Sequence, residues 1–277
     1  MPEESPKYFR EEGLVGKTAL ITGGSSGLGL AFAHHLGSRG FDIVVLARNQ
    51  GRIENALAGL RAQGIRAEGY VCDISDEKRL GEVAGIVKAN HPELDFLILN
   101  AGVLTTKLLG DYAGPEELRK DLEIDLLGVI FSAFFFLPLL KKQSRILMVS
   151  SGFGLMGAAG YSVYCAAKAG IVNFAESLRR ELLCKEINVY VACPGDMETP
   201  QFENEIKNQP PWMKQGSPRK VLAVDVAAKR ILKQCAGKRK FLIISSSDVT
   251  LLSLVSKLLP RTVRDFLLDG MMPRPKQ

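Results

Sequence analysis

The chain has 277 residues, of which 46% are hydrophobic and 24% are charged, so it can bury a large core and is neither disordered nor fibrous. Its five cysteines form no CxxC pair and stand beside only three histidines, which argues against a disulfide scaffold or a bound metal and favours a reducing compartment. The net charge is +6, and the segment from Lys238 onward holds +5 of it, with eight basic and three acidic residues. We expect no nucleic-acid partner, because an enzyme of that class more often spreads its basic charge over the catalytic body.

Residues 1–16 are charged and contain no apolar run long enough for a signal peptide, so we interpret them as an N-terminal arm of a cytoplasmic protein. The longest apolar run, Leu126 to Leu140, is interrupted by Ser132 and Pro138. It is shorter than the roughly 20 residues that a membrane-spanning helix requires. This run is typical of a buried or interface helix.

Up to residue 195, short β-branched apolar runs alternate with longer amphipathic stretches, a pattern typical of repeated strand–helix–strand units. All the runs are short and apolar, as strands are when helices cover both faces of a parallel sheet. The expected strands are 18–22, 42–46, 67–71, 96–99, 145–150, 188–192 and 241–244. The predicted fold class is α/β, a single Rossmann-type domain over residues 17–245 with a doubly wound parallel sheet of about seven strands.

Two segments depart from this alternation. Residues 196–219, which include QPPWMKQGSP, are rich in Pro, Asn and Gln and predict a lid over the substrate. Residues 246–277 form a basic extension in which the leucines between Leu251 and Leu259 make an apolar helical stripe. Apolar area beside cationic charge is typical of a helix on anionic lipid, so we expect peripheral membrane contact there; packing on the core or on a second subunit is the alternative.

A glycine-rich turn, TGGSSGLG, follows the first expected strand and opens a helix. Its glycines allow a tight turn and a close approach of the backbone to a pyrophosphate, whose charge lies at the positive end of the helix. Taken alone, the pattern would equally suit a strand-to-helix turn that binds nothing. The predicted cofactor contacts in this turn are Gly23, Ser25, Ser26, Gly27, Leu28 and Gly29.

Residues after the next three strands favour a dinucleotide. Arg48 stands nineteen residues after Gly29, where such a unit meets the adenosine ribose. Its planar donor fork suits a 2'-phosphate, which favours NADPH/NADP+ over NAD(H). Arg52 would add a second contact or be a solvated arginine, and Asp73 would accept from the adenine amino group. Small residues that let the backbone lie close to the cofactor end the fourth strand, at Asn100, Ala101 and Gly102; each of these residues alone is also an ordinary cap or turn.

Tyr164 and Lys168 are four residues apart, so they share one face of a helix. A phenol has a reference pKa near ~10, and a positive charge beside it would lower that pKa and make Tyr164 a usable acid and base. Ser151, thirteen residues before Tyr164, would hold the substrate oxygen as charge develops. Ser150 is the alternative, but strand alternation should direct the two serines to opposite sides.

Together, TGGSSGLG, Asn100-Ala101-Gly102, Ser151, Tyr164-xxx-Lys168 and Pro194-Gly195 resemble the short-chain dehydrogenase/reductase family over residues 17 to about 245. The resemblance implies that hydride passes between a nicotinamide and a carbonyl carbon while Tyr164 transfers the proton. Lys168 would also bind the nicotinamide ribose, and Ser151 would orient the substrate. It further implies a homodimer or homotetramer, and cofactor contacts after the sixth strand at Pro194, Gly195, Met197 and Thr199, the last with the nicotinamide carboxamide.

The sequence departs from this family at one position. The family usually has an asparagine in the helix before the fifth strand, where it holds a water in a proton relay, and here Asp125 aligns with it. An ionised aspartate can accept a hydrogen bond from water but cannot donate one, so the relay would be altered. A helix carboxylate without a catalytic part is the alternative.

Within the family, the stretches TGGSSGLG, ARNQGR, DMETPQFENE and RDFLLDGMM resemble the 3-ketodihydrosphingosine reductases, which reduce a long-chain 3-keto amine with NADPH in sphingolipid synthesis. The implied substrate is a hydrophobic carbonyl, a long-chain lipid. One alternative is a reductase or dehydrogenase of a steroid, retinoid or acyl derivative. Another, motivated by Asp125, is an NADP(H)-binding sensor with little turnover.

Overall fold

The computed structural model describes residues 17–213, 221–236, 241–246, 249–250, 262–263 and 269. The predicted N-terminal arm, the end of the predicted lid at 214–219 and the leucine stripe of the C-terminal extension lie outside the described residues.

Seven parallel strands form one sheet in the order β3-β2-β1-β4-β5-β6-β7. The strands are β1 Lys17–Thr22, β2 Phe41–Ala47, β3 Ala67–Val71, β4 Leu94–Leu99, β5 Leu140–Val149, β6 Asn188–Ala192 and β7 Leu242–Ile243. The order reverses between β1 and β4, so the sheet is doubly wound and the predicted fold class is confirmed. The carboxyl ends of parallel strands share one edge, and folds of this kind bind ligands at that edge beside the point of reversal.

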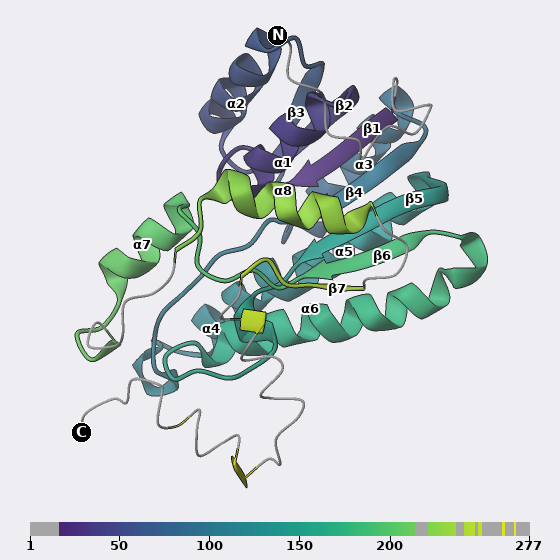
Figure 1. Ribbon diagram of the computed structural model, residues 1–277. Helices are drawn as coiled ribbons and strands as arrows, with labels where there is room; N and C mark the ends of the chain where they lie inside the picture. The colour runs from purple at the N-terminus through teal and green to yellow at the C-terminus, as the bar shows by residue number, and fades with distance from the viewer. Residues whose placement is uncertain are drawn as a thin grey trace, which may run out of the picture.

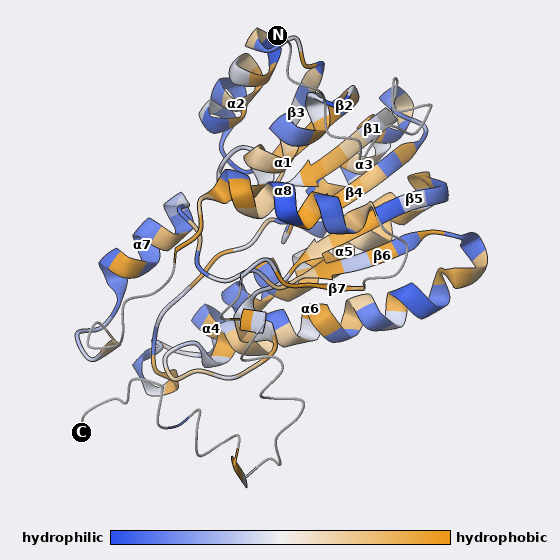
Figure 2. Cartoon of the chain, viewed as in Figure 1, coloured by the Kyte–Doolittle hydropathy of each residue, from blue (hydrophilic) through white to orange (hydrophobic). Residues whose placement is uncertain are grey.

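Helices cover both faces of the sheet (Figure 1). They are α1 Gly27–Gly37, α2 Gln50–Ala62, α3 Glu77–Asn90, α4 Pro115–Leu122, α5 Gly128–Phe136, α6 Ser162–Glu181, α7 Pro200–Asn208 and α8 Val224–Cys235. Helices α1 and α8 pack together on one face, and α3, α5 and α6 pack on the other. Figure 2 shows the consequence, with apolar strands in the centre and polar residues on the outer sides of α6 and α8. Helix α7 stands apart from both layers (Figure 1).

The helical segment before β5 is longer than the predicted apolar run, and the strand that follows it begins earlier than the sequence predicts. Helix α4, a π-helical turn at Glu123–Leu127, helix α5 and a short 3-10 turn form one segment, Pro115–Leu139, which is long and apolar enough to cross a membrane by length and composition alone. Its residues Val129, Ala133 and Phe136 are buried against the sheet. Strand β5 then begins at Leu140, five residues before the predicted start. The prediction misses this part of the strand because residues 141–143 are polar and exposed and lack the apolar signal of a strand.

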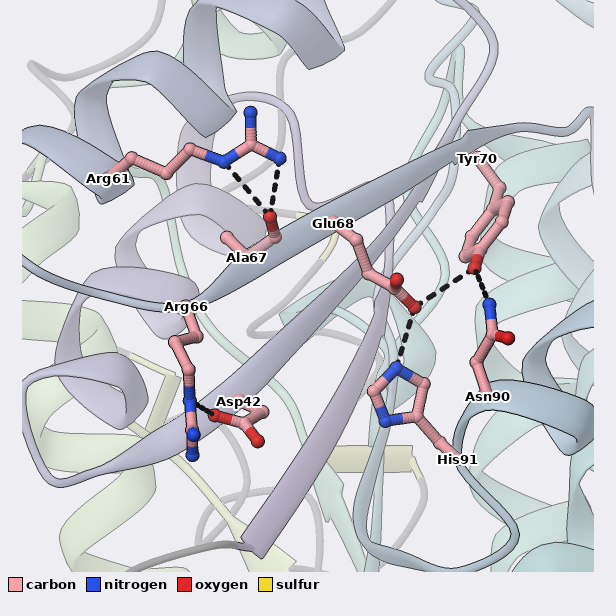
Figure 3. Close-up of polar contacts among 8 residues, drawn as sticks. All are labelled: Asp42, Arg61, Arg66, Ala67, Glu68, Tyr70, Asn90 and His91. Carbon is pink, nitrogen blue, oxygen red and sulfur yellow. Dashed lines mark hydrogen bonds and ion pairs between the residues drawn. The ribbon is translucent and has the colours of Figure 1, made fainter.

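Strand β3 forms one edge of the sheet and carries two polar side chains, Glu68 and Tyr70 (Figure 3). Glu68 accepts a hydrogen bond from the Tyr70 hydroxyl at 3.0 Å and lies 2.7 Å from His91 Nε2. Arg61 donates to the backbone carbonyl of Ala67. Charged groups of this kind discourage the pairing of an edge strand with another chain.

Candidate active site

The glycine-rich turn joins β1 to α1 and is built so that only glycine fits at its centre. Gly23 has φ +67° and Gly27 has φ +52°, which is the left-handed region that glycine adopts without strain. A Cβ at Gly29 would lie 2.3 Å from the carbonyl oxygen of Gly23. Helix α1 begins at Gly27 with no capping bond from the Ser26 side chain and no acidic residue in its first turn. This bare helix N-terminus fits the negative charge of a phosphate.

Asn100 fixes the end of β4 against this turn. Its side-chain Nδ2 donates to the carbonyls of Thr22 and Gly23, both at 3.3 Å. In return, Thr22 Oγ1 accepts from the backbone N–H groups of Asn100 at 3.0 Å and Ala101 at 3.2 Å. The two loops at the point of strand reversal are therefore one hydrogen-bonded unit, so the amide of Asn100 has a structural role that the sequence pattern does not reveal.

Arg48 and Asp73 lie together at the ends of β2 and β3. Their Nη1 and Oδ2 atoms are 3.9 Å apart, and the Arg48 side chain is 55% exposed. The other carboxylate oxygen of Asp73 accepts from the backbone N–H and the hydroxyl of Ser75. Arg52 stands in the first turn of α2, where its backbone N–H donates to the capping side chain of Asn49. An accessible guanidinium therefore stands where the sequence predicts contact with the adenosine ribose.

Tyr164, Lys168 and Asp125 form the buried centre of the site. Lys168 Nζ lies 5.3 Å from the centroid of the Tyr164 ring and 3.4 Å from Asp125 Oδ1. Asp125 also accepts from the backbone N–H of Val103 at 2.8 Å. A Cβ at Gly102 would meet Asp125 Oδ1 at 2.6 Å and Lys168 Nζ at 3.0 Å, so the ion pair needs glycine at that position.

Asp125 reaches this centre from the π-helical turn at Glu123–Leu127, between α4 and α5. A π-turn interrupts the regular α-helical spacing and is frequent at functional sites. The sequence predicts a helix at Asp125 before β5 but contains no signal for the π-turn. The structure brings Asp125 to Lys168, which sequence reasoning does not pair with it.

The pKa of Tyr164 differs from the expectation. The sequence predicts that Lys168 lowers it, but in the structure burial raises the pKa of Tyr164 well above its usual value and the negative charge of Asp125 raises it further. The hydrogen bond with Ser151 acts in the opposite direction. The predicted net lowering by Lys168 is therefore wrong for this structure. The physical reason is that the ammonium is paired with Asp125 while the phenol is removed from water.

The two serines after β5 face different partners. The Ser150 hydroxyl is buried and donates to the backbone carbonyl of Lys168 at 2.8 Å, so it anchors α6. The Ser151 side chain is hydrogen-bonded with Tyr164 and also accepts from the backbone N–H of Phe153 at 3.2 Å. Ser151 is therefore the serine beside the phenol.

The segment after β6 closes the site from the other side. The Pro194 carbonyl accepts from Gly152 N–H at 2.8 Å. Met197 makes a parallel bridge with Leu222. Thr199 caps α7 by accepting from the Phe202 N–H, and a Cβ at Gly27 would lie 3.4 Å from its methyl group. The last predicted contact in this segment, Gly195, lies against Ser246. Thr199 therefore lies beside the glycine turn.

Several residues beside Tyr164 have no counterpart in the predicted site. Apolar side chains gather around the phenol from four segments, and Trp212 and Met213 of the predicted lid are among them. Phe153 stacks on Tyr161 with ring centroids 4.5 Å apart. The members are Tyr161, Tyr164, Cys165 and Met213, with Leu104, Phe153, Ala158 and Trp212 packed against them.

A buried carboxylate adjoins this apolar cluster. Glu205 Oε1 accepts from the Tyr161 hydroxyl at 2.6 Å and from Gln209 Nε2 at 2.9 Å. Sequence reasoning misses Glu205 because a glutamate in the polar stretch QFENEIKN is typical of a solvated helix face.

Comparisons with known proteins agree with this architecture. Residues 17–210 match the model of a family described as short chain dehydrogenase. The chain is 30% identical to 11-beta-hydroxysteroid dehydrogenase-like 2 of Arabidopsis thaliana, over 95% of this chain and 84% of that protein. It is 34% identical to a 3-dehydrosphinganine reductase of Arabidopsis thaliana, over 69% of this chain and 59% of that protein.

Solved structures are similar over most of the chain. A short chain dehydrogenase from Burkholderia cenocepacia in complex with NADP has a TM-score of 0.73 at 24% identity, covering 85% of this chain and 99% of that one. A short chain dehydrogenase/reductase from Burkholderia phymatum in complex with NAD has a TM-score of 0.78 at 21% identity, covering 95% of this chain and 98% of that one.

Proposed function

The chain belongs to the short-chain dehydrogenase family, and from this premise we propose that it is an NADP(H)-dependent ketoreductase of a long-chain 3-keto amine. The leading substrate is 3-ketodihydrosphingosine, reduced to dihydrosphingosine. The observation that carries the reductase assignment is the contact of Tyr164 with Ser151 and Lys168 at the carboxyl ends of the strands.

The glycine turn and Arg48 support the assignment of NADP(H) as the cofactor. The bare N-terminus of α1 fits the pyrophosphate, and the exposed Arg48 guanidinium fits a 2'-phosphate. Solved relatives of this fold hold NADP in one case and NAD in another, so the choice of NADP(H) rests on Arg48. When bound, NADPH supplies the hydride.

The chain's own groups would handle the carbonyl oxygen. Ser151 and Tyr164 would both donate to that oxygen and hold it in place as negative charge develops. Burial keeps the pKa of Tyr164 high, so the phenol is protonated at neutral pH and can act as the acid of a reduction. Lys168, held by Asp125, would bind the nicotinamide ribose and stabilise the phenolate after the proton has left.

The apolar cluster around Tyr164 supports a hydrophobic substrate, and the 3-dehydrosphinganine reductase relative supports the 3-keto amine. A second candidate is a hydrophobic ketone of another kind, such as a steroid. It is favoured by the hydroxysteroid dehydrogenase-like relative, which aligns over 95% of this chain.

We also propose that the protein is a cytoplasmic homodimer or homotetramer with peripheral contact to membrane lipid. The 69% exposed Phe134 on α5 supports a subunit contact at that helix. The lipid contact rests on the sequence of the C-terminal extension alone.

The test is NADPH oxidation with 3-ketodihydrosphingosine, a steroid ketone and a 3-oxoacyl thioester in parallel. We expect Tyr164→Phe to lower kcat by about 10²- to 10⁴-fold while NADPH affinity stays the same, because the lost group acts on the proton and not on the phosphates. Tyr70→Phe, at the edge strand, is the matched control. Turnover of the steroid alone would favour the second candidate, and NADPH binding without oxidation against any ketone would favour the sensor.

A further inference from the structure

Three charged side chains are buried among the residues that the structure describes: Asp125, Lys168 and Glu205. Asp125 and Lys168 pair with each other in the centre of the site. Glu205 is 5% exposed and takes no part in the proton transfer described above. Because burying a carboxylate is costly, its position beside a catalytic phenol requires an explanation.

Glu205 is held in a fixed position against the start of the catalytic helix. The Tyr161 hydroxyl and Gln209 Nε2 both donate to its Oε1, and Gln209 Nε2 is also 3.0 Å from the Tyr161 hydroxyl. The backbone carbonyl of Tyr161 in turn accepts from Cys165 N–H in the first turn of α6. The carboxylate is therefore anchored one helical turn from Tyr164 and cannot swing out to solvent without breaking these bonds.

Glu205 lies near the reacting centre, because it is hydrogen-bonded to Tyr161, which stands three residues before Tyr164 and in the same apolar cluster. Its negative charge accordingly acts with burial and Asp125 to raise the pKa of Tyr164. A carbonyl that receives the Tyr164 proton must lie within hydrogen-bond distance of the phenol. A charged group on the carbon next to that carbonyl would then experience the same buried carboxylate. In a site with little water, this interaction is much stronger than in solution. Its sign favours a cation and disfavours an anion.

We propose that Glu205 is a specificity-determining residue that selects ketones carrying an ammonium group on the carbon next to the carbonyl. This inference deepens the proposed function and rests on it. The Tyr161–Glu205–Gln209 cluster supplies a preorganised negative charge, and the apolar cluster beside it would accept the hydrocarbon part of the same substrate. Neutral ketones of equal length would be poorer substrates, and ketones with a carboxylate beside the carbonyl poorer still.

The test compares two ketones that differ only in the amine: 3-ketodihydrosphingosine and 1-hydroxyoctadecan-3-one, assayed below the pKa of the amine. Glu205→Gln removes the charge and keeps an oxygen that can accept from Tyr161. We expect it to lower kcat/KM for the amino ketone about tenfold or more and to leave the other ketone within about twofold. Glu203→Gln, an exposed carboxylate on the same helix, is the matched control and should change neither value.

Equal losses on both ketones would show that Glu205 only supports α7, and would overturn the inference while leaving the ketoreductase intact. Equal kcat/KM of the wild type for the two ketones would overturn it too, and that measurement does not depend on whether the variant folds. If the wild type reduces neither long-chain ketone, the lipid substrate is refuted. Aminoacetone and butanone, assayed with the same variants, then decide the inference separately.

Discussion

The ion pair of Asp125 and Lys168 leads to a quantitative prediction for the pH dependence of the enzyme. Lys168 Nζ is 3.4 Å from Asp125 Oδ1 and 5.3 Å from the Tyr164 ring centroid, so the carboxylate lies at most about 8.7 Å from that centroid. At an effective dielectric constant of about 20, a unit charge at ~8.7 Å contributes about 2 kcal/mol, which is about 1.4 pH units in the pKa of the phenol. Asp125→Asn should therefore lower the pKa of Tyr164 by about one pH unit or more.

The sign of the effect is clearest in the oxidation of the alcohol, where the proposed mechanism requires ionised Tyr164 to accept the proton. Oxidation should rise with pH up to the pKa of Tyr164, which burial and Asp125 hold above its usual value. In Asp125→Asn the rising limb of that profile should move to lower pH, and the released charge of Lys168 acts in the same direction. The assay is kcat/KM for alcohol oxidation with NADP+ against pH.

Glu116→Gln, whose side chain is 86% exposed on α4, is the matched control and should leave the profile unchanged. Thermal unfolding is measured alongside, because Asn keeps the acceptor for Val103 N–H but leaves Lys168 buried without its charge partner. A rising limb that stays in place or moves to higher pH in a folded Asp125→Asn protein would refute the electrostatic account.

Substitutions in the ribose contact, the glycine turn and the two serines after β5 test other parts of the site. Arg48→Asp should lower the ratio of kcat/KM for NADPH to that for NADH by about 10- to 100-fold, and an unchanged ratio removes Arg48 from the cofactor contacts. Gly29→Ala places a Cβ 2.3 Å from a backbone oxygen and should abolish NADPH binding in a fluorescence titration, whereas Gly59→Ala, with no atom within 4 Å, should bind normally. Ser151→Ala should lower kcat by about 10²-fold or more. Ser150→Ala should instead lower the free energy of unfolding by about 1–3 kcal/mol, because it leaves the buried backbone carbonyl of Lys168 without the hydroxyl that donates to it. A loss of kcat in Ser150→Ala and a loss of stability in Ser151→Ala would exchange the roles of the two serines.

The sequence predicts most of the sheet, since most of its strands are covered on both faces and carry a continuous apolar run of strand length bounded by turn residues. The glycine turn can also be predicted from the sequence, because its positive φ angles and its close contacts admit only glycine. The start of β5 cannot be predicted in this way. Leu140 pairs with Leu94 of β4, but the next three residues, 141–143, are polar and exposed and lie at an irregularity of the register, so no apolar run marks them as part of a strand.

Interactions between distant segments are the part of the site that sequence reasoning does not recover. Asp125 and Lys168 are 43 residues apart, and their pairing depends on a π-turn that leaves no mark in the sequence. The pKa of Tyr164 depends on burial by residues from other segments, so the local i, i+4 spacing with Lys168 gives the wrong sign. The burial of Glu205 likewise cannot be predicted from the sequence, because it depends on the hydrogen bond between α7 and Tyr161, which lies 44 residues earlier in the chain.

Helix α7 unites the two halves of the site. At its N-cap Thr199 lies beside the glycine turn, and nearly two helical turns later Glu205 accepts a hydrogen bond from the hydroxyl of Tyr161, which packs beside Tyr164. Any shift of α7 along its axis would therefore disturb the cofactor side and the substrate side together. A residue such as Glu205 can act on specificity because the helix that carries it is fixed at both points. A change that loosened Thr199 should for the same reason weaken the discrimination between an amino ketone and its neutral analogue.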